Sequence, residues 1–326
     1  MTTAQKPAST FMVVLAFATV YLVWGSTYFF IQKAIHDLPA LLLGAIRFLA
    51  SGFIMLAWCI YKKERLWHWP QVKPALITGL LLLFIGNGAV IWAEKSLASS
   101  LVAVLVSAAP IWFVLLDKPK WKENLTNRKT ILGLVIGFIG VILLFSEQTA
   151  KVLNGSGSSY QVLGLLILLI GSLSWAGGSL FSKYNSSGSS TVNTTWQMLA
   201  AGFVFLPSSF IGNEWNGFEW STVSTGAWLS VLYLIFFGSL AGYSAYVWLL
   251  KVRPATQVST YAYVNPVVAV LLGVFLAGEK MSVLQLTGLA VILTSVLLIN
   301  LSKSKKVKKE VKPALVTEMI PKEKAC

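Results

Sequence analysis

Charge is what this sequence has least of. Only 12% of its 326 residues are Asp, Glu, Lys or Arg, about half the share found in soluble globular proteins. Most of the chain must therefore lie where charges are unfavourable, which excludes a soluble fold and makes the lipid bilayer the expected solvent. The two cysteines, Cys59 within an apolar run and Cys326 at the C-terminus, offer neither a disulfide nor a metal-ligand spacing. We expect no metal and no cofactor.

Residues for catalysis are also scarce. The sequence has two histidines, His36 and His68, and both lie in or near predicted loops. The apolar segments hold only isolated acidic residues, so no nucleophile with its base and no carboxylate pair is expected inside the membrane. No Gly-x-x-x-x-Gly-Lys-Ser/Thr motif for ATP phosphates occurs. We predict a protein that is neither an enzyme nor driven by ATP.

Long apolar runs fill the sequence, since 56% of the residues are hydrophobic. A helix of about 20 such residues crosses the hydrocarbon core of a bilayer. The fold class predicted is therefore an all-α integral membrane protein with ten transmembrane helices. The predicted spans are residues 11–31, 39–61, 74–94, 98–116, 130–146, 161–182, 194–212, 227–250, 255–277 and 283–301.

Lys and Arg residues predict the orientation, because they concentrate in cytoplasmic loops. With the N-terminus inside, 21 of the 26 Lys and Arg residues fall on the inner side and four on the outer side, while Arg47 lies within a span. Both termini are therefore predicted to be cytoplasmic. The net charge of +14 then reflects topology and a lysine-rich tail near anionic headgroups. Nucleic acid is not an expected partner.

The sequence repeats itself. At an offset of 150 residues, the segment 49–56 shares five of eight residues with 199–206. At slightly larger offsets, Trp24 matches Trp175 and Pro110 matches Pro266. We predict two copies of a five-helix unit joined by a Gly- and Ser-rich linker. The predicted organisation is an N-terminal tail (1–10), a first repeat (11–146), a linker (147–160), a second repeat (161–301) and a lysine-rich tail (302–326).

Five is an odd number, so the second copy must enter the membrane upside down relative to the first. Inverted repeats build two gates that face opposite sides of the membrane around a midplane site, as alternating access requires. The repeat therefore predicts a transporter before any family is considered.

Several motifs agree with this prediction. They are Trp24-Gly25-Ser26-Thr27-Tyr28-Phe29, Arg47-Phe48-Leu49-Ala50, Gly86-Asn87-Gly88, Ala93-Glu94, the run from Tyr261 to Ala269, and Gly278-Glu279. In these motifs the sequence resembles the EamA family of the drug/metabolite transporter superfamily, and within it the YedA-type exporters. The resemblance implies ten helices and efflux of metabolites or drugs across the cytoplasmic membrane of a bacterium. At Ala98-Ser99-Ser100 the sequence departs from the Pro-Ser-Gly usual in that subgroup.

Arg47 lies deep within the second predicted span, where a charge costs about 2.5–3.5 kcal/mol on insertion scales. A group inside the bundle or an anionic group on the substrate must compensate for it. Its repeat partner is Gln197, which is uncharged. Both a structural and a functional role stay open.

A polar stripe is predicted on the third span, where Asn87, Ile91 and Glu94 share one helical face. Glu94 is the candidate for proton coupling, because a desolvated carboxyl can exchange protons near neutral pH. The alternative is that Glu94, next to Lys95, only anchors the end of the helix.

Pro110 and Pro266 occupy matching positions in two spans and are candidate hinges. Aromatic and amide side chains nearby predict a substrate site that is apolar with a few polar groups. Some of these aromatic residues could instead belong to the belts at the membrane surface. The candidate substrate-binding residues are Trp24, Ser26, Asn87, Trp92, Trp175, Tyr243, Tyr246, Tyr261 and Asn265.

The predicted function is export of small metabolites or drugs, either amino-acid-like or amphipathic, by a secondary transporter that uses the proton gradient. One alternative is a carrier of nucleotide sugars or organic phosphates, although a dianionic phosphate would favour more than one intramembrane Lys or Arg. Another is an uncoupled facilitator. Small-residue faces, such as Gly133 with Gly137, favour packing within the chain and could also support a homodimer.

Overall fold

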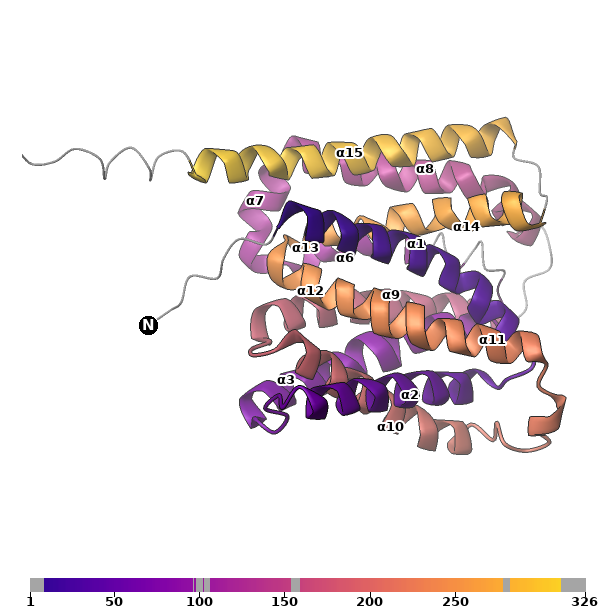
Figure 1. Cartoon of the computed structure of the whole chain (residues 1–326). Coiled ribbons are helices and arrows are strands. Elements are labelled where there is room, and N and C mark those ends of the chain that lie inside the picture. The colour runs from indigo at the N-terminus through magenta and orange to yellow at the C-terminus, as the bar shows by residue number, and fades with distance from the viewer. Residues whose placement is uncertain are drawn as a thin grey trace, which may run out of the picture.

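The computed structural model describes residues 9–95, 97, 102, 106–153, 159–277 and 282–311. Within these ranges the chain is helical and contains no β-strand. The helices lie side by side in one bundle (Figure 1). Five helical segments are long and apolar enough to cross a membrane, and a sixth forms if the bent pair Lys118–Thr126 and Arg128–Leu143 counts as one span. The five are Thr10–Ile35, Ala40–Tyr61, Trp69–Ala93, Leu166–Asn185 and Thr225–Val252.

The first half contains α1 (Thr10–Ile35), α2 (Ala40–Tyr61), α3 (Trp69–Gly79), η1 (Leu80–Asn87), α4 (Gly88–Ala93), α6 (Ala109–Leu116), η2 (Lys118–Lys120), α7 (Trp121–Thr126) and α8 (Arg128–Leu153). The second half contains α9 (Ser159–Asn185), α10 (Ser190–Ile211), η3 (Trp220–Thr222), α11 (Thr225–Tyr233), η4 (Leu234–Tyr243), α12 (Ser244–Val252), α13 (Ala255–Val258), α14 (Tyr261–Ala277) and α15 (Val283–Val311).

These helices cover the predicted spans, with two differences at the ends. α8 continues to Leu153, past the predicted end at residue 146, and α15 continues to Val311. Part of the predicted linker and part of the predicted tail are therefore helical. Of the fourth span, predicted at 98–116, most residues before position 106 lie outside the described part of the chain, as do residues 154–158 of the linker.

A π-helical segment lies within one long helix of each half. η1 lies between α3 and α4, and η4 lies between α11 and α12. In each segment a carbonyl oxygen accepts a hydrogen bond from a side chain on the first helix of a half: Leu81 accepts one from Ser174 Oγ (2.8 Å), and Gly238 accepts one from Trp24 Nε1 (3.1 Å). π-helical turns are rare and often lie at functional sites. The sequence analysis did not predict them.

α2 and α10 pack against each other and carry the strongest part of the sequence repeat. A Cβ on Gly52 would meet the side chain of Leu199, and a Cβ on Gly202 would meet that of Leu49. Glycine therefore permits the close approach in both directions. Because Gly52 pairs with Gly202 in the repeat, and Leu49 with Leu199, these contacts are equivalent when the two halves are exchanged.

The last long helices of the two halves, α8 and α15, also pack together. Gly133 faces Ile299, Gly137 faces Ser295 and Gly140 faces Ile292, so the two helices run in opposite directions. Ser295 Oγ donates a 2.6 Å hydrogen bond to the carbonyl oxygen of Gly133. The small-residue face on α8 is thus covered by a helix of the same chain.

A matched pair of turns follows α2 and α10. Lys63 and Asn213, which are 150 residues apart, both adopt a φ of 54°, the left-handed conformation common just after a helix. The next residue in each turn is a glutamate. Glu214 Oε2 accepts hydrogen bonds from the backbone N–H groups of Leu41 (2.9 Å) and Leu42 (3.0 Å), at the start of α2.

Glu64 makes the corresponding contact at the other end of the bundle. Its Oε1 accepts a hydrogen bond from Ser189 Oγ (3.3 Å), the residue before α10. The end of each helix thus lies beside the start of the other, so α2 and α10 are antiparallel. We call the Glu64–Ser189 and Glu214–Leu41 contacts the two end clasps.

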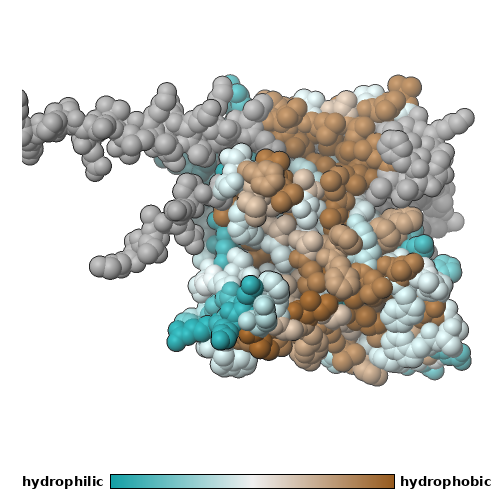
Figure 2. Space-filling model, in the orientation of Figure 1, coloured by the Kyte–Doolittle hydropathy of each residue, from teal (hydrophilic) through white to brown (hydrophobic). Residues whose placement is uncertain are grey.

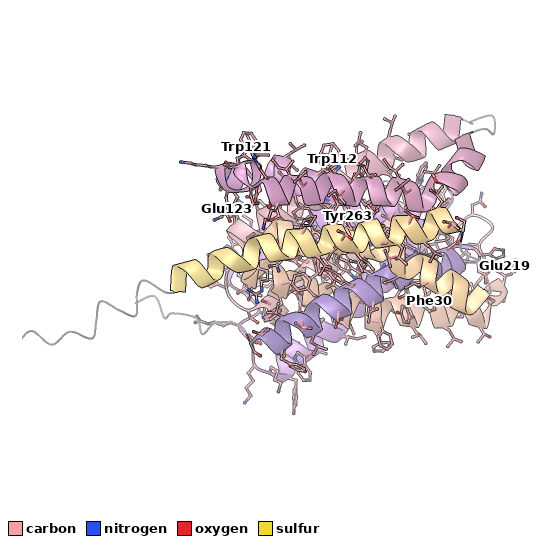
Figure 3. All side chains as sticks on the ribbon, turned by 90° about the horizontal axis from the view of Figure 1, so that it is seen from above. Phe30, Trp112, Trp121, Glu123, Glu219 and Tyr263 are labelled. Carbon is pink, nitrogen blue, oxygen red and sulfur yellow. The ribbon has the colours of Figure 1, made fainter. Side chains whose placement is uncertain are left out.

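The surface is banded. Figure 2 shows hydrophobic residues across the middle of the bundle and more hydrophilic residues toward its ends. In the view from above, Trp121 and Glu123 lie at one end and Glu219 at the other (Figure 3). α1 begins and α15 finishes at the same end (Figure 1), as an even number of membrane crossings requires.

Candidate functional site

A cavity of about 70 Å³ lies inside the bundle, lined by residues from both halves. One water molecule needs roughly 10–15 Å³ measured in this way, so the cavity holds a few water molecules or a small solute group. Its walls combine aromatic rings with a few polar side chains and one charged side chain. The lining residues are Trp24, Thr27, Tyr28, Ile31, Arg47, Phe48, Leu83, Gly86, Asn87, Val90, Val106, Ala109, Leu168, Gly171, Ser172, Trp175, Gly238, Tyr243, Tyr261 and Asn265.

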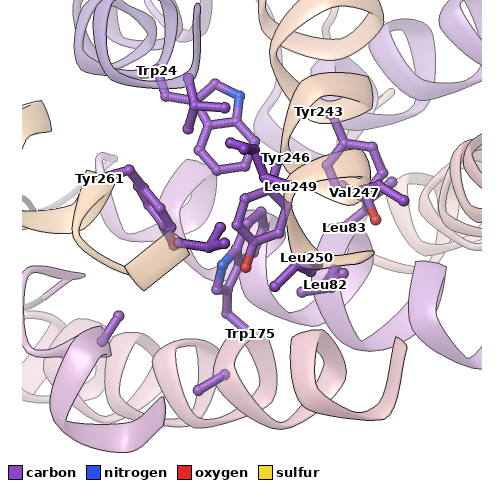
Figure 4. Packing of buried hydrophobic residues seen from close by; sticks show 14 of the residues in the cluster. Trp24, Leu82, Leu83, Trp175, Tyr243, Tyr246, Val247, Leu249, Leu250 and Tyr261 are labelled. Atoms are coloured by element: carbon purple, nitrogen blue, oxygen red, sulfur yellow. The ribbon is translucent and has the colours of Figure 1, made fainter. Parts of the chain in front are cut away.

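Four aromatic rings, those of Trp24, Trp175, Tyr246 and Tyr261, form a cluster (Figure 4), and all but Tyr246 line the cavity. The ring centre of Trp24 lies 5.4 Å from that of Trp175, 4.9 Å from that of Tyr246 and 5.0 Å from that of Tyr261. Edge-to-face and tilted pairs at such distances are favourable. Because Trp24 and Trp175 are repeat partners, each half of the chain contributes one tryptophan to this aromatic cluster.

Arg47 lies on α2 and is only 4% exposed. Its Nε donates a 2.9 Å hydrogen bond to Ser239 Oγ, and its Nη1 donates a 3.3 Å hydrogen bond to Asn87 Oδ1. The guanidinium carbon also lies 4.9 Å from the centre of the Phe48 ring. No carboxylate of the described residues forms an ion pair with it. Among the described residues, only neutral groups therefore contact this buried charge.

Glu94 follows α4 and is 7% exposed. Neither of its carboxylate oxygens has a hydrogen-bond partner within the described ranges. Glu94 is not among the lining residues of the cavity, but it lies within electrostatic reach of Tyr28, whose hydroxyl also interacts with the side chain of Asn265. The neighbouring Lys95 lies 3.8 Å from Glu214 instead.

Six of the nine predicted substrate-binding residues line the cavity: Trp24, Asn87, Trp175, Tyr243, Tyr261 and Asn265. Tyr246 belongs to the aromatic cluster without lining the cavity, and its hydroxyl lies 2.6 Å from Ser179 Oγ. The other two lie elsewhere. Ser26 Oγ is 2.6 Å from the Tyr233 hydroxyl, and Trp92 is half-buried outside the lining.

Sequence reasoning left out some of the lining residues, among them Tyr28, Phe48 and Ser172. Tyr28 and Phe48 stand in the motifs that carry the family resemblance, and this was the available signal for them. Ser172 lies one helical turn before Trp175 and had no motif to mark it.

The two candidate hinge prolines differ in their surroundings. Pro110 lies in the first turn of α6, just after a turn at Ser107 and Ala108. Proline is tolerated there because backbone N–H groups in the first turn have no acceptor within the helix, so the N–H that proline lacks is not missed. Pro266 lies inside α14, and that segment is interrupted earlier, at Ser259 and Thr260. Each half therefore has a break shortly before its proline.

At the end of the bundle that carries Glu219, Asp37 connects the loop after α1 to the start of α11. Its Oδ2 accepts a 3.0 Å hydrogen bond from the backbone N–H of Ser224. Hydrogen bonds from Ser224, then from His36, lower the pKa of Asp37 from 3.8 to about 2. The carboxyl group of Asp37 is therefore ionised throughout the physiological pH range and can accept the hydrogen bond from Ser224. No group of three His, Cys, Asp or Glu side chains that could hold a metal occurs in the described part of the chain.

A bundle of apolar helices around a central polar and aromatic cavity is the architecture of a multi-pass membrane transporter. The model of the EamA-like transporter family matches residues 11–146 and again residues 162–301. This chain belongs to the EamA-like transporter family, with one copy of the family's unit in each half.

Two relatives extend this assignment. The chain is 36% identical over 293 residues to the "Uncharacterized inner membrane transporter YedA" of Escherichia coli K12, covering 88% of this chain and 90% of that protein. It is 28% identical over 290 residues to the "Probable amino-acid metabolite efflux pump" of Salmonella typhimurium, covering 86% and 92%. A crystal structure with 18% identity and a TM-score of 0.72, covering 89% of this chain and 97% of that one, shares the fold. The protein is thus a transporter of the bacterial inner membrane.

Proposed function

We propose that this transporter exports small amphipathic or amino-acid-like solutes from the cytoplasm by alternating access. The observation that carries the proposal is the central cavity, to which both halves contribute side chains. A solute held there contacts both halves, so a rocking motion of one half against the other would expose it first to one side of the membrane and then to the other.

The proposed architecture is ten spans in two inverted repeats of five, with both termini in the cytoplasm. Three observations support it. α2 and α10 are repeat partners and pack antiparallel, as do α8 and α15. A π-helical segment occurs in the same long helix of each half. α1 begins and α15 finishes at the same end of the bundle.

Proton coupling through Glu94 is part of the proposal. An ionised carboxylate without a hydrogen-bond donor is costly away from water, whereas the protonated form is far less so. Glu94 lacks such a donor among the described residues, and it lies within electrostatic reach of Tyr28, which lines the cavity. Protonation of Glu94 would therefore respond to changes at the cavity wall.

Export can be tested with inverted membrane vesicles from cells that overproduce the protein. We expect vesicles to accumulate amino acids or amphipathic amines when the lumen, which corresponds to the periplasm, is made more acidic than the medium, because protons leaving the lumen drive the solute in. The accumulation should be lost when the gradient is collapsed. Vesicles with an empty expression vector are the control. Accumulation that is equal with and without the gradient would identify an uncoupled facilitator. Accumulation of nucleotide sugars or organic phosphates alone would move the protein to the other substrate class.

A further inference from the structure

The charged side chain of the cavity has an arrangement that a purely structural role does not explain. A guanidinium group carries five N–H donors. The two hydrogen bonds of Arg47 use Nε and Nη1 and go to the neutral oxygens of Ser239 and Asn87. A buried cation without a counter-ion leaves a large electrostatic cost. An anion that enters the cavity would remove this cost.

Gly238 allows Nη2 of Arg47 to lie close to the backbone of η4. A Cβ on this residue would stand 3.0 Å from Nη2, so any side chain there would press on the guanidinium group. Gly238 and Arg47 both line the cavity. The two hydrogen bonds of Arg47 use Nε and Nη1, so Nη2 is the guanidinium nitrogen left for a ligand in the cavity that Arg47 lines.

Gly238 also contacts Trp24, one of the aromatic side chains that form the apolar part of the cavity wall. The carbonyl oxygen of Gly238 accepts the hydrogen bond from Trp24 Nε1, and Trp24 packs against Trp175 and Tyr261. The charge and the aromatic rings are thus neighbours within one cavity. A ligand that fits both has a single anionic group with an apolar or aromatic body next to it.

The charge of the site limits the ligand to an anion with a single negative charge. Arg47 is the one charged side chain among the described lining residues, so a single negative charge is matched and a second would lie unpaired in a buried site. Carboxylate is the planar anion that accepts two parallel hydrogen bonds from a guanidinium group. We propose that Arg47 binds the carboxylate of the transported solute, which is an amino acid or a related monocarboxylate with an apolar or aromatic side chain. This rests on the proposed transport function.

Binding to the purified protein tests the proposal apart from transport, because a ligand of the folded state raises the unfolding temperature. Four probes share a phenyl group and a short chain: L-phenylalanine, 3-phenylpropionate, the neutral 3-phenylpropionamide and the cationic 3-phenylpropylamine. We expect the apparent affinity for 3-phenylpropionate to exceed that for the amide by about tenfold or more, which is the range of a charge-assisted hydrogen bond.

Substitution at Arg47 gives the second comparison. Arg47→Gln introduces the residue found at the repeat-equivalent position 197 and should abolish the preference for carboxylate over amide while amide binding survives. Arg47→Lys keeps the charge and should retain part of the preference. Arg128→Gln, at an exposed position at the start of α8, is the matched control and should behave as the wild type.

Two results would overturn the proposal: equal affinity of the wild-type protein for carboxylate and amide, or an unchanged preference in a folded Arg47→Gln variant. Either result, combined with gradient-driven accumulation of neutral or cationic solutes in inverted vesicles, would remove the role of Arg47 and leave the export function standing. If no solute accumulates in vesicles but the carboxylate preference disappears in Arg47→Gln, the binding role stands and the export function falls.

Discussion

Asn87 and Ser239 both accept a hydrogen bond from Arg47, and they occupy the same position in the two repeats, because Gly86-Asn87 aligns with Gly238-Ser239. Asn87 is the last residue of η1, and Ser239 lies within η4, so one guanidinium group connects the two π-helical segments. The repeat partner of Arg47 is Gln197, which is uncharged. The hydrogen bonds from Arg47 to η1 and η4 therefore have no counterpart in the second repeat, although η1 and η4 are themselves equivalent.

Removing one of these acceptors should destabilise the protein. In Ser239→Ala the Nε of Arg47 loses its acceptor in a buried site, which costs about 1–3 kcal/mol. Ser230→Ala is the control, because Ser230 is equally buried but donates only to the Gly226 carbonyl of its own helix. Thermal unfolding in detergent should show a lower midpoint for Ser239→Ala than for Ser230→Ala. Equal midpoints would mean that the bond contributes nothing to stability.

Two glycines should respond to alanine with opposite signs. A Cβ on Gly79 would collide with the backbone of Gln197, whereas a Cβ on Gly177 would meet only Leu116, at 4.0 Å. Gly79→Ala should destabilise by about 1–3 kcal/mol or more through overpacking. Gly177→Ala should be neutral or stabilise by up to about 1 kcal/mol, because alanine favours the helix. Thermal unfolding of both variants checks this, and a stable Gly79→Ala protein would contradict the close approach of α3 to α10.

The clasp at Glu214 should behave as a helix cap. Glu214→Ala leaves the N–H groups of Leu41 and Leu42 without their acceptor and should cost about 1 kcal/mol. Glu214→Gln keeps an acceptor but loses the favourable charge at the helix start, so its effect should be smaller. Hydrogen exchange of the peptide containing Leu41 and Leu42 should be faster in Glu214→Ala. Glu219→Ala, an exposed carboxylate of the same loop, should leave this exchange rate unchanged.

Glu94→Gln should separate binding from coupling. Glutamine keeps the size and hydrogen-bonding capacity of the side chain but cannot titrate, so gradient-driven export should fall and its pH dependence should flatten. Glu219→Gln is the matched control. An unchanged rate and pH profile in Glu94→Gln would make Glu94 a structural residue.

Asp37 cannot produce a pH dependence near neutrality. Its pKa is lowered from 3.8 to about 2 by the hydrogen bonds from Ser224 and His36. A depressed carboxyl pKa contributes stability that is complete above 3.8 and is lost only as the pH falls toward 2. A pH effect on transport between pH 6 and 8 therefore does not come from Asp37.

The native cysteines test the topology. Cys59 is fully buried, so a membrane-impermeant maleimide should react at Cys326 alone. We expect labelling of inverted vesicles and none of intact spheroplasts. A cysteine introduced at Glu219, in the loop between α10 and α11, should show the opposite pattern. Labelling of Cys326 from the outside would contradict an even number of spans with a cytoplasmic N-terminus.

The sequence predicted the helices well because apolar runs of sufficient length have few alternatives in a bilayer. The aromatic pair Trp24 and Trp175 was also predictable from the sequence, since the internal repeat aligned the two residues. The two π-helical segments were not, because they arise from contacts with neighbouring helices, as in the hydrogen bonds to Leu81 and Gly238.

The residues that line the site were predicted less completely. A helical face drawn at 3.6 residues per turn placed Asn87, Ile91 and Glu94 together, yet only Asn87 lines the cavity. Ser26 and Trp92 were expected at the site for their residue types, whereas their actual direction depends on how α1 and α4 rotate against the rest of the bundle. Sequence periodicity does not specify that rotation.

The two end clasps are built from the same parts, a left-handed residue followed by a glutamate that reaches the start of the antiparallel partner helix. In an alternating-access cycle, one clasp would loosen as the other tightens, so most of the free energy cancels between the two conformations. What remains is the difference between the copies: Glu214 binds two backbone amides and lies near Lys95, whereas Glu64 binds one serine hydroxyl. A free-energy difference of about 1.4 kcal/mol is a tenfold ratio of populations, so in the proposed cycle one substitution at either clasp would shift the ratio between the inward-facing and the outward-facing conformation.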